Sequence, residues 1–160
     1  MQDLPRDALD LFRRAEVCLG RGEFAAAGDV LERALTLVPD HPELLRRQAV
    51  ALHRLGRFQE AAAVLQGVLH ARPDDATVYN NLGSALGAAG DMSGAVVALR
   101  RACELAPQRA NYWYNLAKAL EGVADAAEAC TALTRFLELE PEDAEARILR
   151  ADSLKTLGRL

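Results

Sequence analysis

The chain has 160 residues and a mass of 17.3 kDa, which suits one domain or an array of small repeats but not two large domains. With 51% hydrophobic residues, 11 glycines and 6 prolines, the composition excludes a disordered or collagen-like chain and predicts a soluble, helix-rich protein. The net charge of −4 is spread evenly, with 12 acidic and 10 basic residues in 1–80 and 11 and 9 in 81–160. Neither half is a basic arm, so we expect no nucleic-acid partner.

The sequence carries no signal for export or membrane insertion. Residues 1–7 are not a basic stretch leading into an apolar one, and no run approaches the roughly 20 apolar residues of a membrane helix. Three cysteines without close spacing indicate neither a disulfide framework nor a zinc site, and they favour a reducing compartment. We therefore expect a cytoplasmic protein with no membrane partner. Arginine outnumbers lysine 17 to 2, which together with the abundance of alanine indicates a bacterial genome.

The main pattern is a 34-residue period, marked by four evenly spaced prolines: Pro39, Pro73, Pro107 and Pro141. It divides the chain into a lead-in over 1–7 and the repeats 8–41, 42–75, 76–109 and 110–143. Residues 144–160 are then a capping helix or a truncated fifth repeat. Counted from the first residue of each repeat, position 20 is always alanine and position 24 always leucine. A period of this length predicts stacked units, none of which buries its apolar face alone.

Each repeat is predicted to form two helices. Apolar residues recur at positions 4, 7, 8 and 11, which is one face of a helix, and a second apolar stripe begins near position 17. Glycine at position 15 ends the first helix in three repeats, as Gly22, Gly56 and Gly90, because glycine adopts a positive φ without strain. The proline at position 32 ends the second helix.

The fourth repeat has Ala124 where the others have the turn glycine. An alanine at positive φ costs free energy of order 1 kcal/mol. Because Gly122 and Asp125 flank this residue, we expect a shifted turn, with the first helix of the repeat ending by Gly122, earlier than its counterparts. The alternative is an unshifted turn with Ala124 strained.

These columns resemble the tetratricopeptide repeat (TPR) family, whose 34-residue pattern is W-x₂-L-G-x₂-Y, A-x₃-F, A, P. The matching residues in the third and fourth repeats are Tyr79, Leu82, Gly83, Leu86, Ala95, Leu99, Ala102, Pro107, Trp113, Leu116, Ala117, Leu120, Ala129, Leu133 and Pro141. The resemblance implies an all-α fold, a right-handed α-solenoid of stacked helix–turn–helix repeats with about nine helices. It also implies a protein or peptide partner bound in a concave groove, and no enzymatic activity, cofactor or small-molecule substrate.

By the same resemblance, exposed residues on the first helix of each repeat line that groove. The candidate binding residues are Arg13, Arg46, Arg47, Arg54, Asn80, Asn81, Ser84, Asn111, Tyr114, Asn115 and Lys118. With Glu16, Glu43 and Glu121 on the same face, this set has five positive and three negative charges. The surplus of +2 favours an acidic peptide, although a solvated charged surface is an alternative.

Position 6 forms a column of related side chains, namely Arg13, Arg47, Asn81 and Asn115. An asparagine amide both donates and accepts hydrogen bonds, so this column is suited to hold the backbone of an extended peptide. A purely structural role of the two asparagines is the alternative.

Other candidate chemistry is weak. His41, His53 and His70 occupy unrelated positions, so no metal site is expected. The glycines at 83, 87 and 90 follow no strand and lack the Gly-Lys-Ser/Thr ending of a phosphate loop. The cysteines Cys18, Cys103 and Cys130 occupy helical positions typical of the core and are expected to be buried.

Two functions remain open: a free-standing adaptor, or the regulatory or substrate-recruiting array of a larger bacterial enzyme such as a glycosyltransferase or sulfotransferase. Residues 157–160 match positions 14–17 at 55–58, which favours a truncated fifth repeat. Arg147 at position 4, where other repeats have large apolar residues, favours a cap instead. The oligomeric state is left open.

Overall fold

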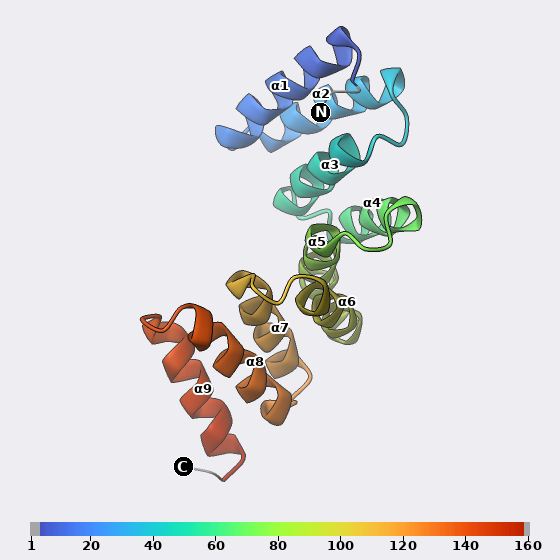
Figure 1. Cartoon of the computed structure of the whole chain (residues 1–160). Coiled ribbons are helices and arrows are strands. Elements are labelled where there is room, and N and C mark those ends of the chain that lie inside the picture. The colour runs from blue at the N-terminus through green and yellow to red at the C-terminus, as the bar shows by residue number, and fades with distance from the viewer. Residues whose placement is uncertain (1–3, 159–160) are drawn as a thin grey trace. The chain divides into compact units, whose positions relative to one another are not determined.

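The computed structural model describes residues 4–158, and these form nine α-helices joined by short turns (Figure 1). The described residues contain no strand, so the all-α prediction is confirmed. The chain divides into two compact units, Met1–Pro73 and Asp74–Leu160. Each unit is described by itself.

The first unit contains α1 (Arg6–Gly20), α2 (Phe24–Leu37), α3 (Pro42–Arg54) and α4 (Phe58–Ala71). Consecutive helices pack side by side, which makes two helix–turn–helix pairs. Its core includes Phe12 of α1, Leu31 of α2 and Leu44 of α3. Ala15 and Ala27, at positions 8 and 20, are fully buried, because small side chains let the paired helices approach closely.

The second unit contains α5 (Ala76–Ala88), α6 (Met92–Leu105), α7 (Ala110–Gly122), α8 (Ala126–Leu139) and α9 (Ala144–Thr156). A continuous core runs through it and includes Leu99, Leu116 and Leu133. Gly83 of α5 lies close against α6. A Cβ at that residue would lie 2.4 Å from Cγ of Leu99, so only glycine fits there.

The second helix of each repeat ends as predicted from the prolines. Helices α2, α4, α6 and α8 each stop two residues before their proline. The residue between them is non-helical in every repeat, for example Ala106 with φ −142° and ψ 68°. Proline sterically disfavours helical geometry in the residue before it, which accounts for this ending.

The prediction of a shifted turn in the fourth repeat is wrong. Helix α7 ends at Gly122, the same repeat position at which α1, α3 and α5 end. Ala124 adopts φ 60°, and its N–H donates to the carbonyl of Glu121, as Gly90 donates to Gly87 in the preceding repeat. The close packing of α7 on α8 fixes the turn, so the alanine accepts the strained conformation.

Helix α9 has the form of a first helix of a repeat. It is followed by Gly158 with φ 66°, whose N–H donates to the carbonyl of Lys155, which is the turn seen at Gly22, Gly56 and Gly90. Ala146 of α9 is fully buried against the core of the second unit. None of the helices in residues 4–158 is long and apolar enough to cross a bilayer.

Candidate functional site

The candidate binding residues lie on the first helices of the repeats, which are α1 and α3 in the first unit and α5 and α7 in the second. The two sets differ in chemistry. In the first unit the set contains four arginines (Arg13, Arg46, Arg47 and Arg54) and two glutamates (Glu16 and Glu43). This unit therefore accounts for the whole charge surplus of +2. In the second unit Lys118 and Glu121 cancel, and the remaining candidates are amides and hydroxyls.

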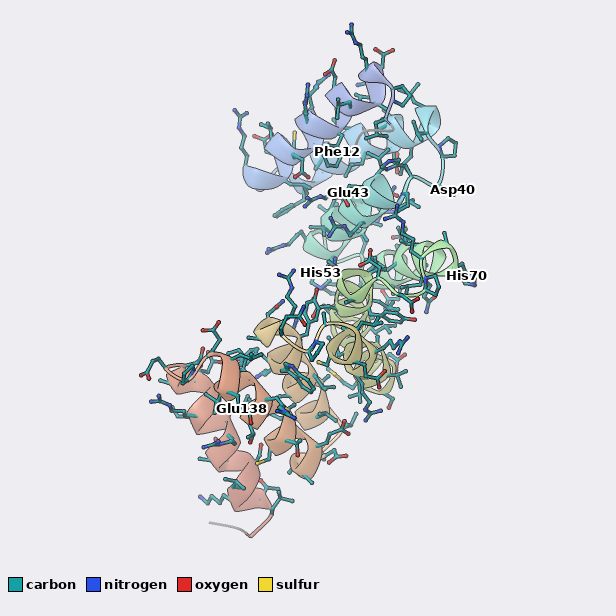
Figure 2. The ribbon with its side chains drawn as sticks, in the orientation of Figure 1. Phe12, Asp40, Glu43, His53, His70 and Glu138 are labelled. Atoms are coloured by element: carbon teal, nitrogen blue, oxygen red, sulfur yellow. The ribbon has the colours of Figure 1, made fainter. Side chains whose placement is uncertain are left out.

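Two of the four arginines of this face, Arg46 and Arg47, are already held by carboxylates. Glu43, which projects from α3 in Figure 2, accepts hydrogen bonds from Nε and Nη2 of Arg46, at 2.6 to 3.0 Å, and from Nε of Arg47 at 3.1 Å. Nε of Arg47 also lies 3.1 Å from Oε1 of Glu16, which links α3 to α1. An acidic ligand on this surface therefore has to compete with two internal carboxylates.

The other two arginines of this face are more available. Arg13 is highly exposed, with a long 3.5 Å contact to Asp10. The Arg54 guanidinium lies over the ring of Phe24, 5.8 Å from its centroid. An exposed cation of this kind binds carboxylates with little desolvation cost.

The expectation that Asn80 is exposed is wrong. Its exposed fraction is 8%, because position 5 of a first helix faces the first helix of the next repeat. Its Oδ1 accepts a hydrogen bond from Nδ2 of Asn115 at 2.9 Å, which joins α5 to α7. The backbone carbonyl of Asn80 accepts a further bond from the hydroxyl of Ser84 at 3.0 Å. Asn80 thus orients two predicted groove residues.

Two of the four position-6 side chains, Arg47 and Asn115, interact with the preceding repeat rather than with one another. Asn115 bonds to Asn80 instead of Asn81, and Arg47 contacts Glu16 instead of Arg13. Asn81 is half-buried on α5, and within residues 4–158 its side chain has no hydrogen-bond partner.

Tyr114, Asn111 and Lys118 complete the predicted set on α7. The Tyr114 hydroxyl donates to Glu145 of α9 at 2.7 Å, and this hydrogen bond, with some burial and the nearby negative charges, raises the pKa of Tyr114 to about 12. Asn111 is exposed, and the Lys118 ammonium lies 3.8 Å from Glu121. Tyr114 therefore serves the packing of α7 on α9 as well as the surface.

The structure also places residues in this face that the sequence reasoning missed. Gly83, Gly87 and Met92 line a hollow beside Ser84, Asn115 and Lys118, with a volume of about 280 Å³. The signal was present in the sequence, because only this repeat has glycine at both positions 8 and 12.

The three cysteines differ in burial. Cys103 is buried, and burial raises its pKa to about 12, so its thiol is a poor nucleophile. Cys18 and Cys130 are half-buried, so the expected burial is confirmed for Cys103 alone. In the part of the chain that the structure describes, no three histidine, cysteine or acidic residues gather as metal ligands would.

A stack of helix pairs with a polar face on its first helices defines a helical-repeat protein of the interaction-scaffold class. Tetratricopeptide repeat family models match residues 19–86, 76–109 and 114–160. The chain belongs to the tetratricopeptide repeat family.

Solved structures share this fold. MamA from residue 41 to its end, of Desulfovibrio magneticus RS-1, is 25% identical, with a TM-score of 0.80 over 86% of this chain and 78% of that one. TTC0263, a thermophilic TPR protein of Thermus thermophilus, is 23% identical, with a TM-score of 0.76 over 95% and 84%. One chain in the crystal structure of the APC/C hetero-tetramer Cut9–Hcn1 is 21% identical, with a TM-score of 0.82 over 92% of this chain and 30% of that one. The comparison with curated proteins finds no match. The predicted class, an α-solenoid of helix–turn–helix repeats, is confirmed.

Proposed function

We propose that this protein is a non-enzymatic adaptor that binds an extended peptide segment of a partner protein on the face of its first helices. The observation that carries the proposal is the Asn80–Asn115 hydrogen bond. The buried amide of Asn80 holds the half-buried amide of Asn115 in one orientation, which lowers the entropy cost of binding a peptide backbone. We further propose that the protein is bacterial and acts in the cytoplasm.

The amides of the second unit support recognition of backbone rather than of charge. An asparagine side chain offers two N–H donors and one carbonyl acceptor. Asn115 uses one donor on Asn80, and in residues 4–158 its other donor and its oxygen have no partner. These two groups match the C=O and N–H of an extended peptide, whatever its sequence.

The first unit supports a preference for acidic residues in the bound segment. Its face carries a surplus of two positive charges, on a chain whose net charge is −4. Arg13 and Arg54 are the cations best placed to attract a carboxylate, since Arg46 and Arg47 share Glu43. Such charges accelerate association more than they strengthen the final complex.

The proposal is tested with a random library of ten-residue peptides, panned against the full chain. The tightest peptide is then titrated by calorimetry into the wild type and into Asn81→Ala, with Thr131→Ala on the outer helix α8 as the control. We expect Asn81→Ala to weaken binding by about fivefold or more, which is the value of one hydrogen bond. Thr131→Ala should leave it unchanged. Equal losses in both variants, or no selected peptide, would contradict the proposal.

The same face would serve the alternative function, in which the repeats recruit a substrate to a larger enzyme. The peptide titration therefore tests binding by the face in both cases. The alternative additionally requires that the bound segment be a substrate of an enzyme attached to, or associated with, these repeats.

A further inference from the structure

The hollow in the second unit exists because side chains are absent from α5. Position 8 is alanine in the other three repeats and position 12 carries Leu19, His53 or Glu121, whereas here the two positions are Gly83 and Gly87. Gly83 is needed for the close approach of Leu99. Gly87 is not needed for packing, because a Cβ there would lie 3.6 Å from Ala95 and 3.8 Å from Sδ of Met92, which are ordinary contact distances.

The floor of the hollow is apolar and its rim is polar. The floor consists of Met92, Ala95 and Leu99 of α6 with the buried Ala119 of α7, and the exposed Ala88 of α5 lies at the edge. The rim consists of Ser84 of α5 and Asn115 and Lys118 of α7. Apolar floors with a few polar rim groups are typical of ligand sites.

The size of the hollow limits its occupant. Its volume is about 280 Å³, at or below the lower end of the roughly 300–1,000 Å³ of small-molecule pockets. It is therefore suited to a single side chain better than to a cofactor. Among the lining residues of the described chain the one charged group is the Lys118 ammonium, whose side chain is 52% exposed. Its contact with Glu121 is long, at 3.8 Å, so a ligand carboxylate competes with a weak internal partner.

We propose that this hollow is a specificity pocket that takes one aliphatic side chain, such as leucine or methionine, from an extended peptide with an acidic residue beside it. The aliphatic side chain covers Met92 and Leu99, and the carboxylate of its neighbour faces Lys118. Asn115, at the rim, holds the intervening peptide group. This inference rests on the proposed peptide-binding function and adds the chemistry of the bound segment to it.

The chain offers a site-specific probe, because it has two methionines, Met1 and Met92. The methyl group of Met92 is labelled with ¹³C, assigned with Met92→Leu, and followed by NMR as the library-selected peptide is added to the full chain. We expect the selected peptides to share an aliphatic residue next to aspartate or glutamate, and the Met92 methyl resonance to shift until saturation. Replacing the aliphatic residue of the peptide by alanine should weaken binding at least about tenfold.

A matched pair of variants tests the pocket from the protein side. Gly87→Leu fills the hollow, whereas Gly67→Leu makes the same change within α4, where a Cβ has no neighbour within 4 Å. Both changes raise helix propensity equally. We expect Gly87→Leu to abolish the Met92 shift and weaken binding at least about tenfold, and Gly67→Leu to change neither. Gly87→Ala, which leaves most of the hollow open, should retain binding.

The outcomes separate the two proposals. If peptides bind but the aliphatic residue is dispensable, or Gly87→Leu binds as the wild type does, the pocket is overturned and the adaptor function stands. If no peptide binds, both are overturned. Should Gly87→Leu fail to fold, Lys118→Gln decides, since loss of the acidic preference supports the pocket and its retention contradicts it.

Discussion

The side chains of Asn80 and Asn115 are joined by a 2.9 Å hydrogen bond that connects the first helices of two successive repeats. Asn80 is the buried partner and Asn115 the half-buried one. Removing either side chain therefore has a consequence for stability that removing the neighbouring Asn81 does not.

We predict that Asn115→Ala lowers the free energy of unfolding by about 1–2 kcal/mol, because the buried Oδ1 of Asn80 loses its donor. Asn81→Ala should change it by less than about 0.5 kcal/mol. Urea unfolding followed by circular dichroism measures both. Equal effects would show that the Asn80–Asn115 bond does not stabilise the packing of α5 on α7.

Trp113 contributes a second stabilising contact in the same unit. It is half-buried against the core, and its Nε1 donates to the carbonyl of Pro107 at 2.8 Å. Trp113→Ala should lower the free energy of unfolding by about 3 kcal/mol, since it removes a large aromatic and one hydrogen bond. Trp113→Phe keeps most of the apolar contact and should cost less than half as much. A loss below about 1 kcal/mol for the alanine variant would mean that the indole is effectively solvated.

Burial of Cys103 predicts a dependence of stability on alkaline pH. Its pKa is raised from 9.0 to about 12 in the folded state. Between these values the unfolded chain releases the thiol proton and the folded chain keeps it, so unfolding becomes easier as the pH rises. This contribution is complete below pH 9 and is lost as the pH approaches 12.

Thermal melts of the wild type and Cys103→Ala at pH 8 and pH 10.5 check this effect. The wild type should lose more stability over this interval than the variant does. The quantity to compare is the loss of stability between the two pH values, because the alanine also leaves a small cavity that lowers stability at both of them. An equal loss of stability in the wild type and the variant would contradict the assignment of the raised pKa to burial of the Cys103 thiol.

Much of the fold could be predicted from the sequence, because local signals determine the helix ends. Glycine at positive φ and the backbone restriction imposed by proline act within a few residues, and the apolar period identifies the buried faces. Ala124 shows where this reasoning fails. There the packing of α7 on α8, the two helices of one repeat, imposes a turn that the local sequence disfavours.

The candidate site was less predictable for a similar reason. Whether Asn80 is exposed depends on the helix that packs over it, which no pattern within its own repeat reveals. The hollow beside Gly87 is formed by the lack of side chains at Gly83 and Gly87 and by the position of Met92 on the neighbouring helix α6. Exposure and cavities are properties of the packed neighbours, so the sequence indicates the face but not its shape.

The strain at Ala124 predicts a stabilising substitution. Ala124→Gly should raise the free energy of unfolding by about 1 kcal/mol, because its φ of 60° is unfavourable for alanine and allowed for glycine. Ala63→Gly, an exposed change inside α4, is the control and should lower it by about 0.5–1 kcal/mol. Differential scanning calorimetry measures both. If both variants lose stability, the turn carries no strain that glycine relieves.

The arginines of the first unit predict a gain in binding. Glu43 accepts hydrogen bonds from Arg46 and Arg47, so it competes with any carboxylate of a ligand on this face. Glu43→Gln removes that competitor and raises the charge surplus of the face from two to three. We expect tighter binding of an acidic peptide selected from the library, by about three- to tenfold, and a steeper loss of affinity as salt is added.

Glu60→Gln is the matched control for this change. Glu60 pairs with Arg57 in the same i to i+3 arrangement, but on α4, outside the face of the first helices. Glu60→Gln alters the net charge of the chain by the same amount as Glu43→Gln does. If the two variants bind the peptide equally well, the gain reflects total charge alone, and the acidic segment does not contact Arg46 and Arg47. A gain restricted to Glu43→Gln places the carboxylates of the peptide beside these two guanidinium groups.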